Sequence, residues 1–321
     1  MYFPYLRGRQ FELIGLRELV NQSLISDKII PIIEPVKFSS TLIKTLDTFV
    51  KNDHEIGIIL NPKIGNFLAE FRDESNYKDK FLKLLTNDNI IKTYLVNENI
   101  KKELSSTIED NNFILINKNK DDFKYYTDLK ESITEPKYAL IPDDRILKRR
   151  VTTSKILLND NFTKLARNAD YDDLSDELFS CDHLYYSTEG YEGFSDYSIV
   201  GDSFSESGFA PYAVTLHIVY YKKNDYDELE LRIHHFVSDS NNDITNPAGK
   251  FNEALKKLMD WIEEEISSNE YFKMTQGLEQ FISCYENENY PGLGTVKKIS
   301  IMHHIELIDM YLRGDISDEN M

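Results

Sequence analysis

The sequence predicts an α/β protein of the (β/α)8, TIM-barrel-like type with an added C-terminal helical segment. Over the first 160 residues, short apolar runs rich in isoleucine alternate with amphipathic helical patterns. These runs are apolar at consecutive positions, which is typical of parallel strands covered on both faces. From residue 247 onward only helical periodicity is present. We therefore expect a barrel domain over 1–245 and a helical segment over 246–321 packed on it.

Taken in order, the elements begin with a helix over 12–23, where apolar residues recur at helical spacing. The expected strands are 29–34, 56–61, 90–97, 113–117, 138–141, 156–159 and 197–201. The expected helices between them are 41–50, 77–85, 101–109 and 123–132. Segments 214–221 and 229–237 are expected to pair as a hairpin across 222–228, with one of them completing the barrel as its eighth strand. Three helices follow, near 251–266, 272–285 and 296–312.

An open, doubly wound sheet explains the same alternation almost as well. The barrel is favoured because strand follows helix so evenly and because no glycine-rich phosphate fingerprint follows the first strand. Segment 190–208 is expected to be a long loop at the barrel mouth, and residues 314–321 are polar and expected to fray.

Composition excludes several classes of protein. With 321 residues and 41% hydrophobic residues, the chain buries a sizeable core. No apolar run approaches the roughly 20 residues of a membrane-spanning helix, and the N-terminus lacks the pattern of a signal peptide. Two cysteines, Cys181 and Cys284, are too few for a disulfide framework and are expected to be plain thiols. A cytoplasmic location is expected.

The net charge of −18 opposes binding of nucleic acid through a general basic surface. The short basic cluster Lys148-Arg149-Arg150 is interpreted as a solvated helix face or a contact with a partner. A cationic protein partner suits this acidic chain better than a polyanion does.

Polar residues recur where the expected strands end. In a barrel, these positions share the C-terminal rim, where barrel enzymes assemble their active sites. The candidate catalytic residues are Glu34 and Asp144, for acid/base work or for holding a metal. Asn61, Lys63, Asn97 and Asp202 are candidate ligand-binding residues. The alternative is that these residues start turns and cap the helices that follow.

Arg7 and Arg9 flank Gly8 just before a helix, which suits an anion held at a helix N-terminus. Ion pairing with acidic residues of this chain explains them equally well. His234-His235 lie in an expected strand, and His303-His304 on an expected helix, so the rings of each pair diverge and do not readily share a metal. No metal-binding, Walker or nucleophile-elbow motif occurs, and no cofactor is identified.

Five segments of the sequence are also distinctive. They are the N-terminal run from Tyr2 to Glu12, Leu16-Arg17-Glu18-Leu19, Ile30-Pro31-Ile32-Ile33-Glu34-Pro35, Asp196 to Asp202, and His234-His235-Phe236. Together they resemble the uncharacterised phage "Beta protein"-like family, from the start of the chain to about residue 240. Members of that family occur in phages, mobile elements and bacterial genomic islands. The resemblance therefore implies a role in conflict between phage and host, as an anti-phage or phage-encoded accessory protein, and implies no reaction.

Three functions stay open at this point, and with them the question of whether the chain is an enzyme. The first is a barrel whose mouth binds a small phosphorylated ligand, with Arg7, Arg9 and Lys63 meeting the anion. The second is a non-catalytic interaction scaffold for a partner enzyme. The third is a metal-dependent phosphodiester hydrolase, which needs clustered carboxylates. Fold alone does not separate these functions.

Overall fold

The computed structural model describes residues 1–73, 76–104, 111–130, 135–205 and 211–316. By its contacts the chain divides into two compact units. The first unit comprises residues 1–22, 27–160 and 182–197, and the second comprises residues 23–26, 161–181 and 198–321. The expected boundary at residue 245 differs from this division, because the long hairpin before it belongs to the second unit together with the C-terminal helices.

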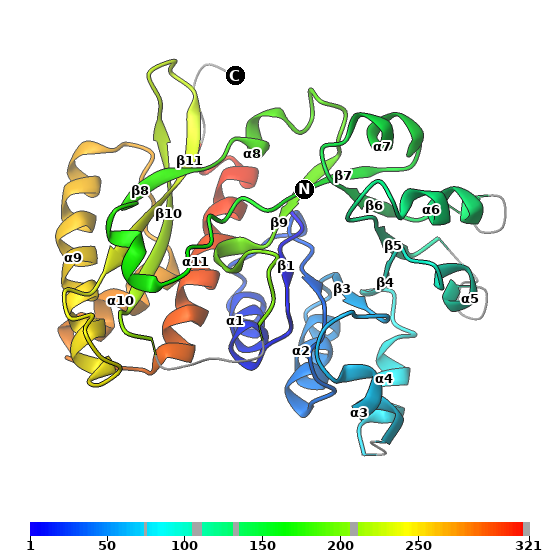
Figure 1. Ribbon diagram of the computed structural model, residues 1–321, viewed down its shortest axis with the longest axis horizontal. Coiled ribbons are helices and arrows are strands. Elements are labelled where there is room, and N and C mark those ends of the chain that lie inside the picture. The colour runs from blue at the N-terminus through cyan, green and yellow to red at the C-terminus, as the bar shows by residue number, and fades with distance from the viewer. Residues whose placement is uncertain (74–75, 105–110, 131–134, 206–210, 317–321) are drawn as a thin grey trace. The chain divides into compact units, whose positions relative to one another are not determined.

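The first unit is a barrel of eight parallel strands (Figure 1). The strands, in their order around the sheet, are β1 (Tyr5–Leu6), β2 (Ile32–Ile33), β3 (Ile56–Ile59), β4 (Ile90–Leu95), β5 (Phe113–Ile116), β6 (Tyr138–Ile141), β7 (Lys155–Asn159) and β9 (Gly193–Asp196). A parallel bridge between Tyr2, just before β1, and Phe194 of β9 brings the two ends of the sheet together. Hydrogen bonds from Phe3 N–H to Phe194 C=O and from Phe194 N–H to Met1 C=O complete the ring.

Helices connect these strands. They are α1 (Gln10–Asn21), α2 (Ser40–Lys51), α3 (Phe67–Asp73), α4 (Lys78–Leu84), α5 (Ile100–Leu104), α6 (Phe123–Lys130), α7 (Arg145–Arg150) and α8 (Asp182–Tyr185). The barrel interior is packed with alternate strand residues, including Phe3, Tyr5, Ile30, Ile32 and Ile59, so it is a filled core and contains no open channel among these residues. The (β/α)8 prediction is thus confirmed. The ends of the expected helices 101–109 and 123–132 lie outside the described residues.

Two strand assignments from the sequence were wrong. The last barrel strand is 193–196, and the expected strand at 197–201 contains the 3₁₀ turn η2 (Ser198–Val200) instead. The eighth strand comes from the N-terminal segment at Tyr5–Leu6, whereas the hairpin forms a sheet of its own. A two-residue strand next to Pro4 carries too little periodicity to be recognised from sequence.

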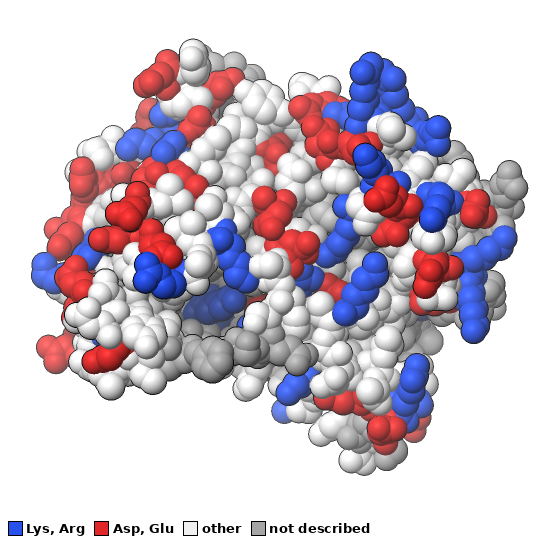
Figure 2. All heavy atoms as spheres, viewed as in Figure 1, with Lys and Arg blue, Asp and Glu red and all other residues white. Residues whose placement is uncertain are grey.

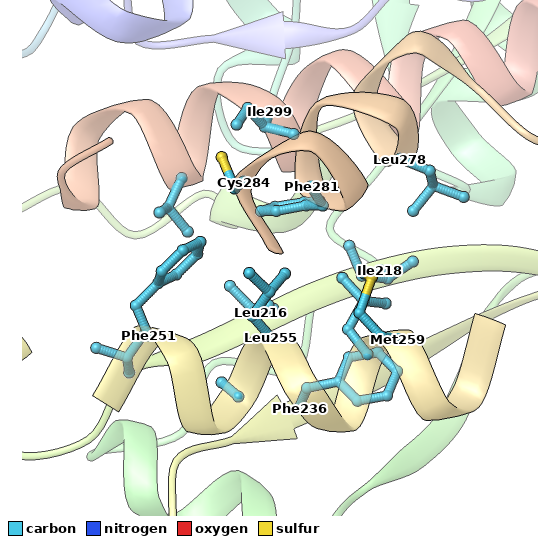
Figure 3. Packing of buried hydrophobic residues seen from close by; sticks show 14 of the residues in the cluster. Leu216, Ile218, Phe236, Phe251, Leu255, Met259, Leu278, Phe281, Cys284 and Ile299 are labelled. Atoms are coloured by element: carbon cyan, nitrogen blue, oxygen red, sulfur yellow. The ribbon is translucent and has the colours of Figure 1, made fainter. Parts of the chain in front are cut away.

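The second unit combines an antiparallel sheet with three helices. The hairpin of β10 (Thr215–Lys223) and β11 (Leu229–Val237) forms as predicted, and β8 (Asp176–Ser180) pairs with β11 in the order β10-β11-β8. The helices are α9 (Pro247–Ser268), α10 (Gln276–Glu286) and α11 (Leu293–Arg313), and the 3₁₀ turn η1 (Asn168–Asp172) lies before β8. Leu216 and Ile218 of β10 pack with Leu255 of α9 and Phe281 of α10 in one buried cluster (Figure 3).

Side chains from two neighbouring segments cover the free edge of β10. His303 on α11 donates from Nε2 to the Val219 carbonyl at 2.7 Å, and its Nδ1 accepts from the Thr275 hydroxyl, also at 2.7 Å. Asn269 Nδ2 donates to the Tyr221 carbonyl at 2.8 Å. Burial lowers the pKa of His303 to about 4, so the ring is neutral and fits this donor–acceptor pattern. The histidine is therefore a structural element of the sheet edge.

Helices α10 and α11 approach closely at Gly277. A Cβ atom at this position would lie 2.7 Å from the Cβ of His303, so only glycine fits without moving a helix. The neighbouring Glu306 of α11 accepts a hydrogen bond from Gln276 N–H at 2.9 Å. It thereby satisfies an N–H group at the start of α10, in addition to the Thr275 cap.

Candidate functional site at the barrel mouth

Strand periodicity directs a polar layer into the barrel at the C-terminal ends of β1 and β2. Phe3 and Tyr5 belong to the interior cluster, so Arg7, two residues further on, continues on the same face. Ile30 and Ile32 lie in the interior in the same way, and Glu34 follows them. Both charged side chains are buried: Arg7 is 4% exposed and Glu34 is 1% exposed.

Gly8 makes the turn that separates Arg7 from the following helix. Its φ of +62° lies in the left-handed region, which glycine adopts without strain. A Cβ atom here would also lie 2.9 Å from Ile33 Cγ2 and 3.1 Å from Pro35 Cα. This turn places Arg7 inside the barrel and Arg9 at the N-cap position of α1, where the Arg9 N–H donates to Glu12 at 3.2 Å.

The Glu34 carboxylate accepts three hydrogen bonds. Oε2 accepts from the Tyr5 hydroxyl at 2.7 Å and from Arg7 Nη1, while Oε1 accepts from the Lys63 backbone N–H at 3.0 Å. Burial and the neighbouring carboxylate raise the pKa of Tyr5 well above its usual value, so the phenol is neutral and donates. Glu34 therefore holds Arg7 in place, and the role that its contacts support is positioning.

Two cationic groups share one pair of aromatic rings. The ring centroids of Tyr5 and Tyr197 are 4.8 Å apart. The Arg7 guanidinium carbon lies 5.1 Å from the first centroid and 5.2 Å from the second, and Lys118 Nζ lies 4.8 Å and 5.0 Å from the same two. These distances lie within the range of cation–π attraction. The rings therefore position both positive charges, and Lys118 is the more accessible of the two because it is only partly buried.

Other candidate residues serve the local backbone. Asn61 bridges to β4 by donating to the Leu95 carbonyl at 2.9 Å and accepting from the Leu95 N–H at 2.8 Å. Asn97 accepts from the Asn99 N–H at 2.7 Å, which is a turn contact immediately before α5. Asp144 is the N-cap of α7, and its Oδ1 accepts from the N–H groups of residues 146 and 147. For Asn97 and Asp144, the described contacts match the turn and capping alternative. Asn61 instead links the end of β3 to β4, and its Nδ2 also donates to Glu103 at 2.5 Å.

The structure thus brings together Arg7, Glu34 and the backbone of Lys63, whose side chain is exposed. Arg9 and Asp144 stand at helix N-caps. Asp202 belongs to the second unit. Among the described residues, no group of three or more histidine, cysteine, aspartate or glutamate side chains is arranged to hold a metal ion.

The paired histidines diverge as expected. His234 Nδ1 faces Asp176 at 3.4 Å, whereas His235 on the opposite face of β11 contacts His217, with 2.7 Å between their Nδ1 atoms. Burial lowers the pKa of His235 to about 4 and that of His217 well below its usual value, so both rings are neutral. One ring therefore donates to the other. Neither Cys181 nor Cys284 forms a disulfide.

Sequence reasoning missed the aromatic part of the mouth. Tyr5 and Tyr197 did not stand out, because tyrosine is common in this chain. The available signal was strand alternation: Tyr5 lies two positions before Arg7, and Tyr197 lies two positions after the buried Ser195 of β9. Lys118 stood beside Asn117 at the end of β5, and the same alternation selects Lys118 for the inner face because Ile114 and Ile116 are interior residues.

In the described part of the chain, every helix is too short or too polar to cross a membrane. No family model matches the sequence, and no curated protein matches it. Among solved structures, the chain is similar to FabK from Thermotoga maritima, with 11% sequence identity over 98% of this chain and 96% of that chain and a TM-score of 0.32. A likeness this weak carries no argument, and the barrel assignment rests on the strand order and on the bridge that closes it.

Proposed function

We propose that the barrel mouth binds a small phosphorylated molecule. The observation that carries this proposal is the placement of Arg7 and Lys118 on the same Tyr5–Tyr197 pair. Both groups stand at the C-terminal ends of barrel strands, the end at which (β/α)8 proteins bind their ligands. Glu34 pairs with Arg7, so Lys118 supplies the positive charge that suits an anion in a chain with a net charge of −18.

The two cations have different roles in this proposal. Arg7 is deeply buried and its charge is paired with that of Glu34, so it forms part of the rigid floor of the mouth. Lys118 is partly buried and has a flexible stem, so its ammonium group meets the phosphate directly. The exposed Lys63 side chain stands beside this layer, because its backbone is hydrogen-bonded to Glu34.

Isothermal titration with inorganic pyrophosphate and with adenosine monophosphate at low ionic strength tests the proposal. Lys118→Met keeps the apolar stem and removes the charge, and should weaken binding about tenfold, since a charge-assisted contact is worth about 1.4 kcal/mol or more. Lys120→Met is the matched control, because Lys120 is exposed and lies outside this cluster. Absence of a saturable heat in the wild type, or equal weakening by the two variants, would contradict the proposal.

A role in conflict between phage and host belongs to this proposal, and it is supported by the resemblance of the N-terminal run to the phage "Beta protein"-like family. Its test is the plating efficiency of a phage panel on bacteria that express the wild type or Lys118→Met. We expect the wild type to change plating of at least one phage, and the variant to lose that effect at equal protein level. Equal plating with and without the wild-type chain would contradict it.

A further inference from the structure

A polar pocket of about 670 Å³ lies in the second unit, where α9 runs past the outer half of the β10–β11 hairpin. Its volume lies within the range of ligand-binding pockets. Toward the base of the hairpin, the same sheet face is apolar and packs on α9 through Leu216, Ile218 and Phe236. Toward the tip, that face changes to Tyr220, Lys222 and Arg232, so the pocket is the polar continuation of a packed interface.

The floor of the pocket is a fixed hydrogen-bond network around Asp176. Its Oδ1 accepts from Arg232 Nε at 2.8 Å and from Arg232 Nη2, and its Oδ2 accepts from the Tyr220 hydroxyl at 2.6 Å. Burial opposes ionisation, but hydrogen bonds from His234, Tyr220 and Arg232 outweigh it and lower the pKa of Asp176 to about 2. Arg232 also donates to Glu230 at 3.1 Å, so its charge is already compensated within the floor.

Helix α9 supplies the wall of the pocket. Trp261, Glu264 and Glu265 line it, and their i, i+3, i+4 spacing places them on one helical face. Four rings pack around Trp261: Tyr220 and Phe272 meet it edge-on at centroid distances of 5.0 Å and 5.6 Å, Phe236 lies at 5.4 Å, and His234 lies tilted at 5.5 Å. Trp261 is therefore a rigid aromatic surface beside two carboxylates.

The charge that remains is negative. Glu265 is buried and accepts from Asn269 at 2.8 Å, with Lys222 at 3.9 Å. The exposed carboxylates of Glu264 and Asp225 make no ion pair within the described parts of the chain. In Figure 2, acidic side chains gather over the α9 region of this unit, at the left of the view. A cation that enters the pocket meets the Trp261 ring, which lines it, and the carboxylates of Glu264 and Asp225, which are not already neutralised.

We propose that this pocket binds the guanidinium group of an arginine in a basic peptide segment of a partner protein. A planar guanidinium stacks on an indole ring while donating to carboxylates at its edge, which an ammonium group does less well. The pocket lies wholly in the second unit, so this inference does not depend on ligand binding at the barrel mouth. A negative result for peptide binding at this pocket would leave the proposal for the barrel mouth unaffected, and the reverse also holds.

The chain carries its own probe, because Trp261 is its single tryptophan. The experiment titrates the whole protein at low ionic strength with a short peptide bearing one arginine between glycines, and follows tryptophan emission. Matched peptides with lysine or glutamate in place of arginine are titrated in parallel. Glu264→Gln removes a pocket carboxylate, and Glu263→Gln makes the same charge change at an exposed neighbour that does not line the pocket.

We expect a saturable change in emission with the arginine peptide, weaker binding of the lysine peptide and no response to the glutamate peptide. Glu264→Gln should weaken arginine-peptide binding about fivefold, as expected for the loss of one solvent-exposed charge contact. Glu263→Gln should leave it unchanged. No saturable response to arginine, preferential binding of the glutamate peptide, or equal effects of the two variants would overturn the proposal.

Discussion

Replacing Glu34 with glutamine tests whether the polar layer of the barrel mouth is built around this carboxylate. In the wild type, Tyr5, Arg7 and the Lys63 N–H all donate hydrogen bonds to the Glu34 carboxylate. The change replaces one of its acceptor oxygens with an amide NH₂ group, which is a donor and cannot accept these bonds. Arg7 is left with a buried positive charge and no compensating negative charge on residue 34. Breaking one partner of a buried ion pair costs about 3–5 kcal/mol.

The loss should be visible as instability of the folded protein. Urea unfolding followed by circular dichroism should show a free energy of unfolding lower by about 3 kcal/mol, and the melting temperature should fall by roughly 5 °C. Glu98→Gln makes the same charge change at an exposed position and serves as the control. In a double-mutant cycle, Arg7→Met should recover part of the loss, because it removes the uncompensated charge.

A small effect would refute this reasoning. If Glu34→Gln unfolds within about 0.5 kcal/mol of the wild type, as a surface substitution does, the carboxylate is not a structural anchor. A group free for acid/base work would then be the better description of Glu34.

Three further predictions concern other elements. Gly277→Ala should destabilise the second unit by roughly 1–3 kcal/mol in urea unfolding despite the helix preference of alanine, because its Cβ would lie 2.7 Å from that of His303; a more stable variant would show that the helices separate freely. Gly8→Ala should cost about 1–3 kcal/mol in the same assay, since alanine is strained at a φ of +62°, and an unchanged urea midpoint would contradict the close contact with Ile33. Burial raises the pKa of Glu306 from 4.5 to about 7, because the folded protein favours the protonated side chain. The contribution of Glu306 to the free energy of unfolding is therefore fully present below pH 4.5 and is lost as the pH rises through 7. Glu306→Gln keeps an acceptor for the Gln276 N–H, so its urea midpoint should rise relative to that of the wild type between pH 4.5 and 7; a constant difference would contradict the raised pKa.

The barrel was predictable because its inner strands carry a strong local signal. Runs such as 56–59 and 113–116 are apolar at every position, and burial on both faces requires that pattern. The ring closure was not predictable, because it depends on a two-residue strand and a single bridge at Tyr2, where tertiary contacts replace local propensity. The same reason explains why the hairpin was assigned to the barrel: its own pattern shows that it pairs, and does not show with which sheet.

The candidate site was predictable in part for a related reason. Arg7 and Glu34 stood out as charges that follow apolar strands, and the structure joins them. Asp144 and Asn97 stood out by the same rule, yet their side chains bind backbone N–H groups at the start of the next helix. Position at a strand end therefore does not distinguish an inward side chain from a capping one. Counting in steps of two from an interior residue selects Lys118 after Ile116, but it equally selects Asn97 after Leu95 and Asp144 after Leu140. Tertiary contacts, which the sequence pattern does not contain, decide between the two roles.

The side chains of His303 and Asn269 on the margin of β10 have a consequence for association. An exposed row of main-chain carbonyls is a template on which another extended chain adds itself, and this is a common route to aggregation. Here the acceptors of residues 219 and 221 are already engaged. Another polypeptide that approaches this edge of the hairpin must therefore bind through its own side chains. Strand addition that depends only on main-chain hydrogen bonds is disfavoured, and binding at this edge becomes selective for sequence.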